Sequence, residues 1–187
     1  MSGGAWGAFG VVVAVLVAAA WLYNRLVRSR NQARQGFADI DVQLKRRADL
    51  VPQLVEAVRG YAAHERALLE NIATLRAAAV SAASAAAGPG AARFAAERGL
   101  GATLQRVLVL QEAYPQLKAD ANFRDLSARL VEVEDHLQYA RRFYNGAVKE
   151  FRDLCESFPE ILVARAFGFS PPPFFETDDR APAQVKL

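Results

Sequence analysis

The stretch Phe37–Val58, FADIDVQLKRRADLVPQLVEAV, decides the fold of this chain. Its apolar residues recur at alternating steps of three and four, which places them on one face of a helix. The same register continues as far as Ala79, and only Arg47 and Glu65 interrupt it with a charge. We therefore predict one long helix from residue 31 to about residue 86, whose apolar face packs against partner helices.

Pro52 lies inside this repeat, where it lacks a donor N–H and its ring clashes with the preceding turn. Because the register passes through Pro52 without slipping, a bent but continuous helix is favoured. The alternative is a helix that restarts here, with Asp49 as N-cap and Pro52 in the first turn, where N–H groups are unpaired anyway. The predicted fold is all-α: an N-terminal transmembrane helix followed by an antiparallel bundle of three long helices, or four if the first is broken at Pro52.

The N-terminal segment Ala5–Tyr23 is almost entirely apolar and uncharged. At ~1.5 Å per residue it would span roughly 28 Å, close to the hydrocarbon core of a bilayer. Trp6 at one end and Trp21 and Tyr23 at the other are placed to lie at the two membrane interfaces. A cleaved signal peptide is the rival interpretation, but such a peptide carries its positive charge before the apolar core, and here the charge follows it. We expect a retained single-pass anchor.

Basic residues follow the anchor directly and continue as a strip to Arg47. The first of them are expected to face anionic lipid head groups: Arg25, Arg28, Arg30 and Arg34. The same asymmetry predicts an N-terminus outside the cytoplasm and a body inside it. No nucleic-acid-binding module accompanies these charges, so nucleic acid is not an expected partner.

Two further helices follow the turn Gly88-Pro89-Gly90. The first runs from about Ala92 to Ala113. The second, from Phe123 to about Ser157 with Asn122 as its cap, has the most regular seam of the chain, typical of a coiled coil or bundle. The seam consists of Leu126, Leu130, Val133, Leu137, Ala140, Tyr144, Ala147, Phe151, Leu154 and Phe158.

The chain after Pro159 is less regular. Glu160–Phe167 is long enough for one or two helical turns, and Pro171-Pro172-Pro173 favours polyproline II. Phe174 and Phe175 would form an exposed apolar patch in water, so they should dock, preferably onto the bundle itself. We divide the chain into an anchor with its basic segment (1–30), a bundle domain (31–169), and a Pro-rich, largely flexible tail (170–187).

A set of short motifs along the chain carries a family resemblance. Together with the apolar segment, and in this order, they resemble the LemA family of bacterial membrane proteins: IDVQLKRRADLVPQLVEAVRGYAAHE (Ile40–Glu65), AYPQLKADANF (Ala113–Phe123), ARRFYNGAV (Ala140–Val148), ESFPE (Glu156–Glu160) and GFSPPPFFE (Gly168–Glu176). The resemblance implies a membrane-anchored antiparallel bundle in the bacterial inner membrane. It supplies no agreed reaction, substrate or cofactor.

No complete catalytic or metal-binding motif is present. A dinuclear carboxylate site in a helical bundle needs Glu-x-x-His pairs, and neither His64 nor His136 has a glutamate three residues before it. The zinc pattern H-E-x-x-H fails after His64 because position 68 is leucine. Cys155 is the single cysteine, which excludes an internal disulfide. We expect no catalytic residue, cofactor or metal.

Arg47 and Glu65 are the candidate polar residues of the long apolar seam. An unpaired buried charge costs several kcal/mol, so each needs a partner or an exit to solvent. They would act as a register-setting polar layer or a partner-binding spot, or Arg47 would snorkel and Glu65 lie at the rim, which we favour. The candidate partners are Glu132 or Asp135 for Arg47, and Arg141 or Arg142 for Glu65.

Two functions are consistent with these observations. The first is a non-enzymatic scaffold or adaptor that holds an unidentified protein partner at the membrane. The second is a membrane-shaping or self-assembling protein that binds anionic lipid through the Arg25–Arg47 strip, as a homo-oligomer.

Overall fold

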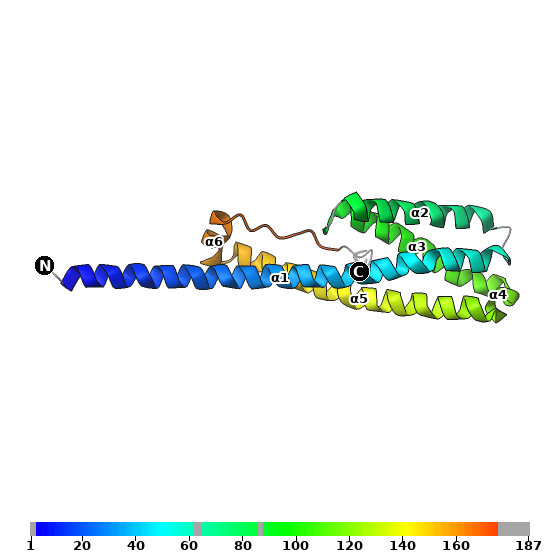
Figure 1. The fold of residues 1–187 in the computed structure, drawn as a ribbon, viewed down its shortest axis with the longest axis horizontal. Helices are drawn as coiled ribbons and strands as arrows, with labels where there is room; N and C mark the ends of the chain where they lie inside the picture. Colours follow the sequence, from blue (N-terminus) through cyan, green and yellow to red (C-terminus); the bar gives the residue numbers. More distant parts are fainter. Residues whose placement is uncertain (1–2, 62–64, 86–87, 176–187) are drawn as a thin grey trace, which may run out of the picture.

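The computed structural model describes residues 3–61, 65–85 and 88–175. These residues form helices and connecting segments and contain no strand, which confirms the all-α prediction (Figure 1). The helices are α1 (Gly3–Arg59), α2 (Arg66–Ala85), α3 (Ala91–Ala113), α4 (Pro115–Ala119), α5 (Ala121–Glu156) and α6 (Glu160–Ala166).

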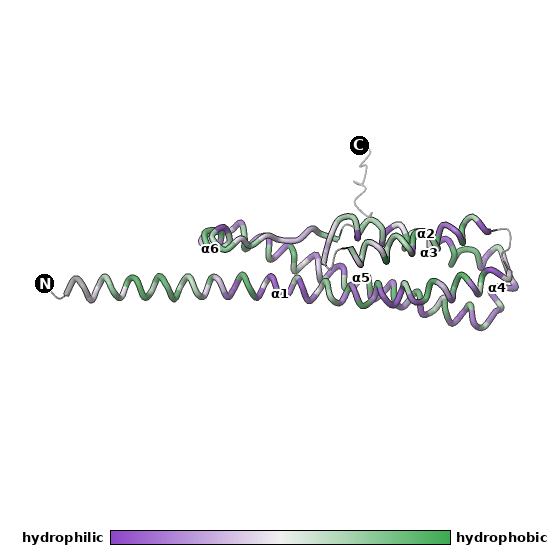
Figure 2. The backbone as a smooth tube through the Cα atoms, turned by 45° about the horizontal axis from the view of Figure 1, so that its top comes forward, coloured by the Kyte–Doolittle hydropathy of each residue, from purple (hydrophilic) through white to green (hydrophobic). Residues whose placement is uncertain are grey.

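Four long helices form an antiparallel bundle at one end of an elongated molecule. The C-terminal half of α1 lies along α5, and α2 and α3 form a hairpin beside them (Figures 1 and 2). The N-terminal part of α1, before the buried Leu26, extends beyond this bundle as a single rod. The apolar segment and the first bundle helix are therefore one helix of 57 residues.

The single helix predicted over residues 31 to 86 is wrong, because the chain turns after Arg59 and resumes as α2 at Arg66. Gly60 follows the last residue of α1, the position at which a glycine commonly ends a helix. The N–H of Tyr61 then donates to the carbonyl of Val58 at 3.0 Å, which closes the turn.

Pro52 does not break α1, as the unbroken register predicted. A proline cannot donate to the carbonyl four residues before it, here that of Ala48. Arg76 of α2 supplies the missing donor, with its Nε 2.9 Å from the Ala48 oxygen. A neighbouring helix thus satisfies the carbonyl that Pro52 leaves without its usual partner.

The seam of α5 is confirmed over nearly its whole length. Leu126, Leu130, Val133, Leu137, Tyr144, Ala147, Phe151 and Leu154 are buried, and Ala140 is half-buried. Phe158 is the exception: it continues the register of the seam, but α5 ends at Glu156 and the Phe158 side chain is 81% exposed.

The cap of α5 is Asp120 and not the predicted Asn122. Oδ1 of Asp120 accepts the backbone N–H of Phe123 at 2.8 Å, the usual bond from an N-cap side chain to the third helical residue. The Tyr61 hydroxyl donates to Oδ2 at 2.9 Å. These two bonds tie the start of α5 to the turn after α1, and they hold the pKa of Asp120 below its ordinary value, with the Phe123 N–H as the larger cause.

One helix in the described part of the chain is long and apolar enough to cross a membrane, and its apolar window lies near the N-terminus. Only 6% of that window is buried inside the protein, so the rest of the chain does not cover its apolar surface. Figure 2 shows this apolar stretch of α1 extending away from the bundle. By length and composition, this part of α1 is the candidate membrane span of the chain.

Candidate functional site

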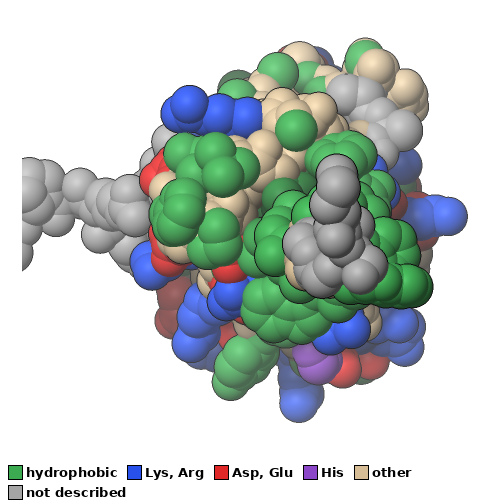
Figure 3. Space-filling view, turned by 90° about the vertical axis from the view of Figure 1, so that its left-hand side faces the viewer, with side chains coloured by type: hydrophobic (Ala, Val, Ile, Leu, Met, Phe, Trp, Pro, Cys, Tyr) green, Lys and Arg blue, Asp and Glu red, His purple; other side chains and the backbone are tan. Residues whose placement is uncertain are grey.

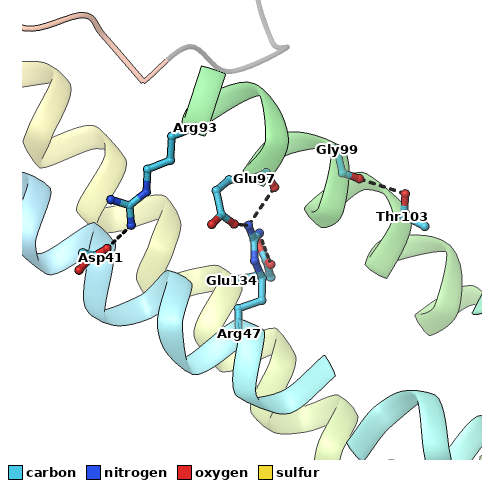
Figure 4. Close-up of polar contacts among 7 residues, drawn as sticks. All are labelled: Asp41, Arg47, Arg93, Glu97, Gly99, Thr103 and Glu134. Carbon is cyan, nitrogen blue, oxygen red and sulfur yellow. Dashed lines mark hydrogen bonds and ion pairs between the residues drawn. The ribbon is translucent and has the colours of Figure 1, made fainter. Parts of the chain in front are cut away.

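Arg47 is fully buried in the centre of the bundle, where three helices meet (Figure 4). Its Nη2 donates to Oε2 of Glu97 at 2.5 Å and to the backbone oxygen of Glu97 at 2.8 Å. Its Nη1 donates to Oε1 of Glu134 at 2.9 Å. One guanidinium of α1 therefore binds two carboxylates, one from α3 and one from α5.

We call Arg47, Glu97 and Glu134 the Arg47 cluster. This cluster separates two hydrophobic cores. On α1, Arg47 lies between Leu44 of the core nearer the N-terminal rod and Val51 of the core at the opposite end. On α3, Glu97 lies in the same way between Phe94 and Leu100. A buried polar layer at this place favours one axial register of the helices, because a shifted helix would leave charges unpaired.

Two further arginines extend this polar layer. Arg93 of α3 is buried, pairs with Asp41 of α1 and lies over the Phe37 ring at 5.1 Å (Figure 4). Arg141 of α5 is also buried, and burial is the main cause that lowers its pKa to about 10, followed by repulsion from Arg47.

The structure corrects the expected surroundings of Arg47. It does not snorkel to solvent, and its partners are Glu97 and Glu134, not Glu132 or Asp135. Glu134 is not a position of the α5 seam, so the three-and-four spacing did not predict it as a partner of Arg47. Glu97 lies three residues from both of the buried residues Phe94 and Leu100, so the same spacing could have identified it as a charge on the buried face of α3. The register-setting polar layer is the alternative that the geometry fits.

Glu65 lies at the rim of the bundle, as expected, and is half-buried. Its Oε1 accepts the hydroxyl of Tyr114 at 3.3 Å, so its partner is neither Arg141 nor Arg142. Burial, and then the neighbouring Glu65 charge, raise the pKa of Tyr114. Arg47 and Glu65 are therefore not parts of one site.

The predicted anchor residues have different surroundings. Trp6 and Trp21 are exposed on α1, whereas the Tyr23 ring packs against those of Phe167 and Phe169, at centroid distances of 5.0 and 5.6 Å. This contact joins the end of the apolar segment to the chain after α5.

The four arginines after the anchor also differ from one another. Arg25 pairs with Glu160 of α6, and Arg30 lies over the Phe169 ring at 5.1 Å. Arg28 and Arg34 are exposed. Arg25 and Arg30 are therefore partly engaged in contacts within the protein itself.

The docking of the tail onto the bundle is confirmed. Phe175 is fully buried, 4.2 Å from the Phe94 ring between centroids. The Asn145 side chain holds the backbone of Phe175 on both sides, because Oδ1 accepts its N–H at 2.8 Å and Nδ2 donates to its carbonyl at 2.9 Å. The buried Tyr144 hydroxyl donates to the Pro173 carbonyl at 2.7 Å. The rest of the tail that was expected to be largely flexible, residues 176–187, lies outside the described residues.

The described residues contain no group of three or more His, Cys, Asp or Glu placed to hold a metal ion. His136 is exposed, 3.7 Å from Glu132, and His64 lies outside the described residues. Cys155 is half-buried beside the core, and burial raises the pKa of its thiol. The chemistry of the Arg47 cluster is charge pairing between helices.

Comparison with known proteins agrees with this architecture. The sequence model of the LemA family matches residues 36–187. Two magnetosome proteins of Paramagnetospirillum magneticum, MamQ 1 and MamQ 2, are each 23% identical over 186 residues, covering 88% of this chain and 68% of the relative. Magnetosome protein MamQ of Magnetospirillum gryphiswaldense is 22% identical over 185 residues, with the same coverage.

Proposed function

We propose, on the premise that this chain belongs to the LemA family, that it is a non-enzymatic, single-pass scaffold whose bundle holds a protein partner at the membrane. In this proposal the apolar part of α1 crosses the bacterial inner membrane with the N-terminus outside. The bundle then lies in the cytoplasm.

The observation that carries the proposal is the continuity of α1 from Gly3 to Arg59. Its distal half supplies Ile40, Leu44 and Val51 to the buried cores. An uninterrupted helix, buried over half its length, holds the bundle at a set height and orientation above the bilayer.

The outer face of α5 is the surface we assign to the partner. Tyr139 and Phe143 lie one helical turn apart, and both remain exposed although they are large and aromatic, Tyr139 at 66%. The Arg142 guanidinium lies over the Tyr139 ring at 5.1 Å. Exposed Tyr and Phe beside Arg are the residue types enriched in protein interfaces.

The names of the matched relatives are compatible with a scaffold. All three are called magnetosome proteins, a description that refers to a cellular structure and names no reaction. That description belongs to those proteins, and we take from it only support for a structural role of this chain.

The second candidate, assembly on anionic lipid through the basic strip, has less support. Arg47 at the end of the strip is buried, and Arg25 is paired with Glu160. Arg34 lies eleven residues beyond Tyr23, roughly 17 Å along a straight helix, and surface attraction decays within a Debye length of ~8 Å at physiological salt. The exposed Arg28 remains close enough to contribute.

Site-specific photo-cross-linking in native membranes tests the scaffold. A photoreactive amino acid replaces Tyr139 or Phe143, and Val80, an exposed apolar residue of α2, is the matched control position. We expect the same non-self protein to be captured from Tyr139 and Phe143 and not from Val80. Capture of this chain alone would favour self-assembly, and no capture at either α5 position would refute the assigned surface.

The orientation has its own test. A reporter fused after Leu187 should behave as cytoplasmic. Periplasmic alkaline phosphatase activity of that fusion would overturn the orientation and place the bundle on the other side of the membrane.

A further inference from the structure

The short helix α6 is amphipathic, with its two faces clearly separated. Glu160 and Ala164, one turn apart, are buried against the bundle. Leu162, on the opposite side of the helix, is 62% exposed. The flanking residues Phe158 and Phe167 are 81% and 65% exposed.

We call these three exposed apolar side chains the α6 patch: Phe158, Leu162 and Phe167. At ~150–250 Å² per aromatic side chain, the exposed fractions of Phe158 and Phe167 correspond to roughly 200–350 Å², and Leu162 adds to this area. The sum is similar to the ~300–600 Å² of the largest apolar patch on a typical soluble monomer, and patches of that size are often functional.

The α6 patch lies at the depth of the membrane surface. The Phe167 ring packs edge-on against that of Tyr23, the last residue of the apolar segment, and Arg25 pairs with Glu160. In Figures 1 and 2, α6 lies beside α1 at the end of the bundle nearest the apolar rod. A membrane crossed by α1 would end beside α6.

The view along the molecule from that end shows the same relation. In Figure 3, hydrophobic side chains gather around α1 and also over the neighbouring surface that faces the viewer. This surface faces the side on which the bilayer would lie. Apolar side chains thus lie both around α1 and on the end of the bundle beside it, with other side chains between the two groups.

The charges of α6 favour lipid as the occupant. Its carboxylate, Glu160, is buried and paired with Arg25, so it does not face the bilayer as a free negative charge. Arg165 is exposed and would reach head groups. Aromatic and leucine side chains on one face, with a basic residue beside them, are typical of helices that lie in a membrane interface.

We propose that α6 and the residues that flank it are a second membrane contact of this chain: a short interfacial segment whose Phe158, Leu162 and Phe167 insert into the bilayer that α1 crosses. The inference rests on the proposed anchoring of α1. Its consequence is that two points attach the bundle to the membrane, so its rotation about α1 is restricted and its α5 face keeps one orientation.

Fluorescent labelling of the full chain in liposomes tests this inference. In a Cys155→Ser background, an environment-sensitive dye is attached at L162C, with Y139C as a control of nearly equal exposure, 66%, on the bundle surface. The liposomes contain lipids that carry a quencher near the head group. We expect a blue-shifted emission at position 162 and about a twofold loss of intensity, because interfacial helices sit ~5–10 Å into the headgroup boundary. Position 139 should show neither effect.

A third label, at V15C near the middle of the apolar segment, is read in liposomes whose quencher is carried deep in the acyl chains, and it separates the inference from the anchoring on which it rests. Quenching at positions 15 and 162 but not at 139 supports both. Quenching at position 15 alone overturns the α6 contact and leaves the anchor. A blue shift at position 162 without quenching shows that protein covers the patch, which also overturns the lipid contact. Absence of quenching at position 15 overturns the anchoring.

Discussion

Nη1 of Arg47 lies 2.9 Å from Oε1 of Glu134, although 87 residues separate the two in the sequence. The bond joins α1, whose N-terminal part is the candidate membrane span, to α5, which runs antiparallel along α1. Because Glu97 of α3 binds the same guanidinium, one buried cation holds three helices in register. Loss of that cation should therefore affect the whole bundle.

Replacement of Arg47 by methionine should destabilise the fold. The change keeps an unbranched apolar stem but removes the guanidinium, so the buried Glu97 and the half-buried Glu134 lose their shared cation, and removal of one partner of a buried pair costs ~3–5 kcal/mol. We expect a clearly lower midpoint of thermal unfolding, followed by circular dichroism in detergent. The triple variant R47M/E97Q/E134Q should recover much of the loss.

The matched control is Arg129→Met. Arg129 pairs with Asp125 at 2.9 Å, but both side chains are exposed, and exposed pairs contribute ~0–1 kcal/mol. An R47M midpoint no lower than that of R129M would contradict the role given to the buried layer.

Gly101 leaves room for the Arg47 guanidinium, and its replacement by alanine tests how firmly that group is held. A Cβ at position 101 would lie 2.9 Å from Arg47 Nη1, a contact that requires a shift. Gly99→Ala is the control, since its Cβ would meet only Leu75 at an ordinary 3.6 Å. Alanine gains ~1 kcal/mol over glycine in a helix, so G99A should raise the unfolding midpoint, whereas G101A should lower it. Equal midpoints would show that the guanidinium moves freely.

Arg76 and Pro52 should be energetically coupled, because Arg76 satisfies the Ala48 carbonyl that Pro52 leaves without a donor. Arg76→Met should cost ~1–3 kcal/mol, the usual loss for an unsatisfied buried polar group. In a Pro52→Ala background the backbone supplies its own N–H, so the same change should cost less. A double-mutant cycle from thermal unfolding measures this difference, and strictly additive effects would refute the coupling.

Asp120 should make the stability of the fold depend on pH in the acidic range. Bonds from the Phe123 N–H and the Tyr61 hydroxyl stabilise the carboxylate, so its pKa is lower in the folded chain than the ordinary 3.8. The stability this gives is present well above pH 3.8 and is lost as the pH falls through the folded pKa. Asp120→Asn keeps a good cap without the charge. The midpoint difference between wild type and D120N should therefore shrink from neutral pH towards pH 3, and a constant difference would contradict the shift.

Local pattern predicted most of the helices of this protein. The three-and-four spacing of α5 identified its buried face from Leu126 to Leu154, because a helix repeats every 3.6 residues and burial follows that repeat. The same reasoning missed the turn at Gly60, since the apolar register continues across it from Val58 to Ile72. A glycine after a helix allows the chain to turn but does not require it to do so. The packing of α2 against α3 determines that the chain folds back there.

Tertiary structure alone decided the partners of the charges and the surroundings of Phe158. The amino-acid sequence by itself determined an apolar N-terminal segment, an all-helical body and Arg47 as a charge on a buried face, because each depends on residues close together in the chain. The pairing of Arg47 with Glu97 and Glu134, and the exposure of Phe158 at the end of the seam, depend on how helices far apart in the chain are placed. Burial periodicity shows which face of a helix turns inward, and it carries no information on which charge lies opposite.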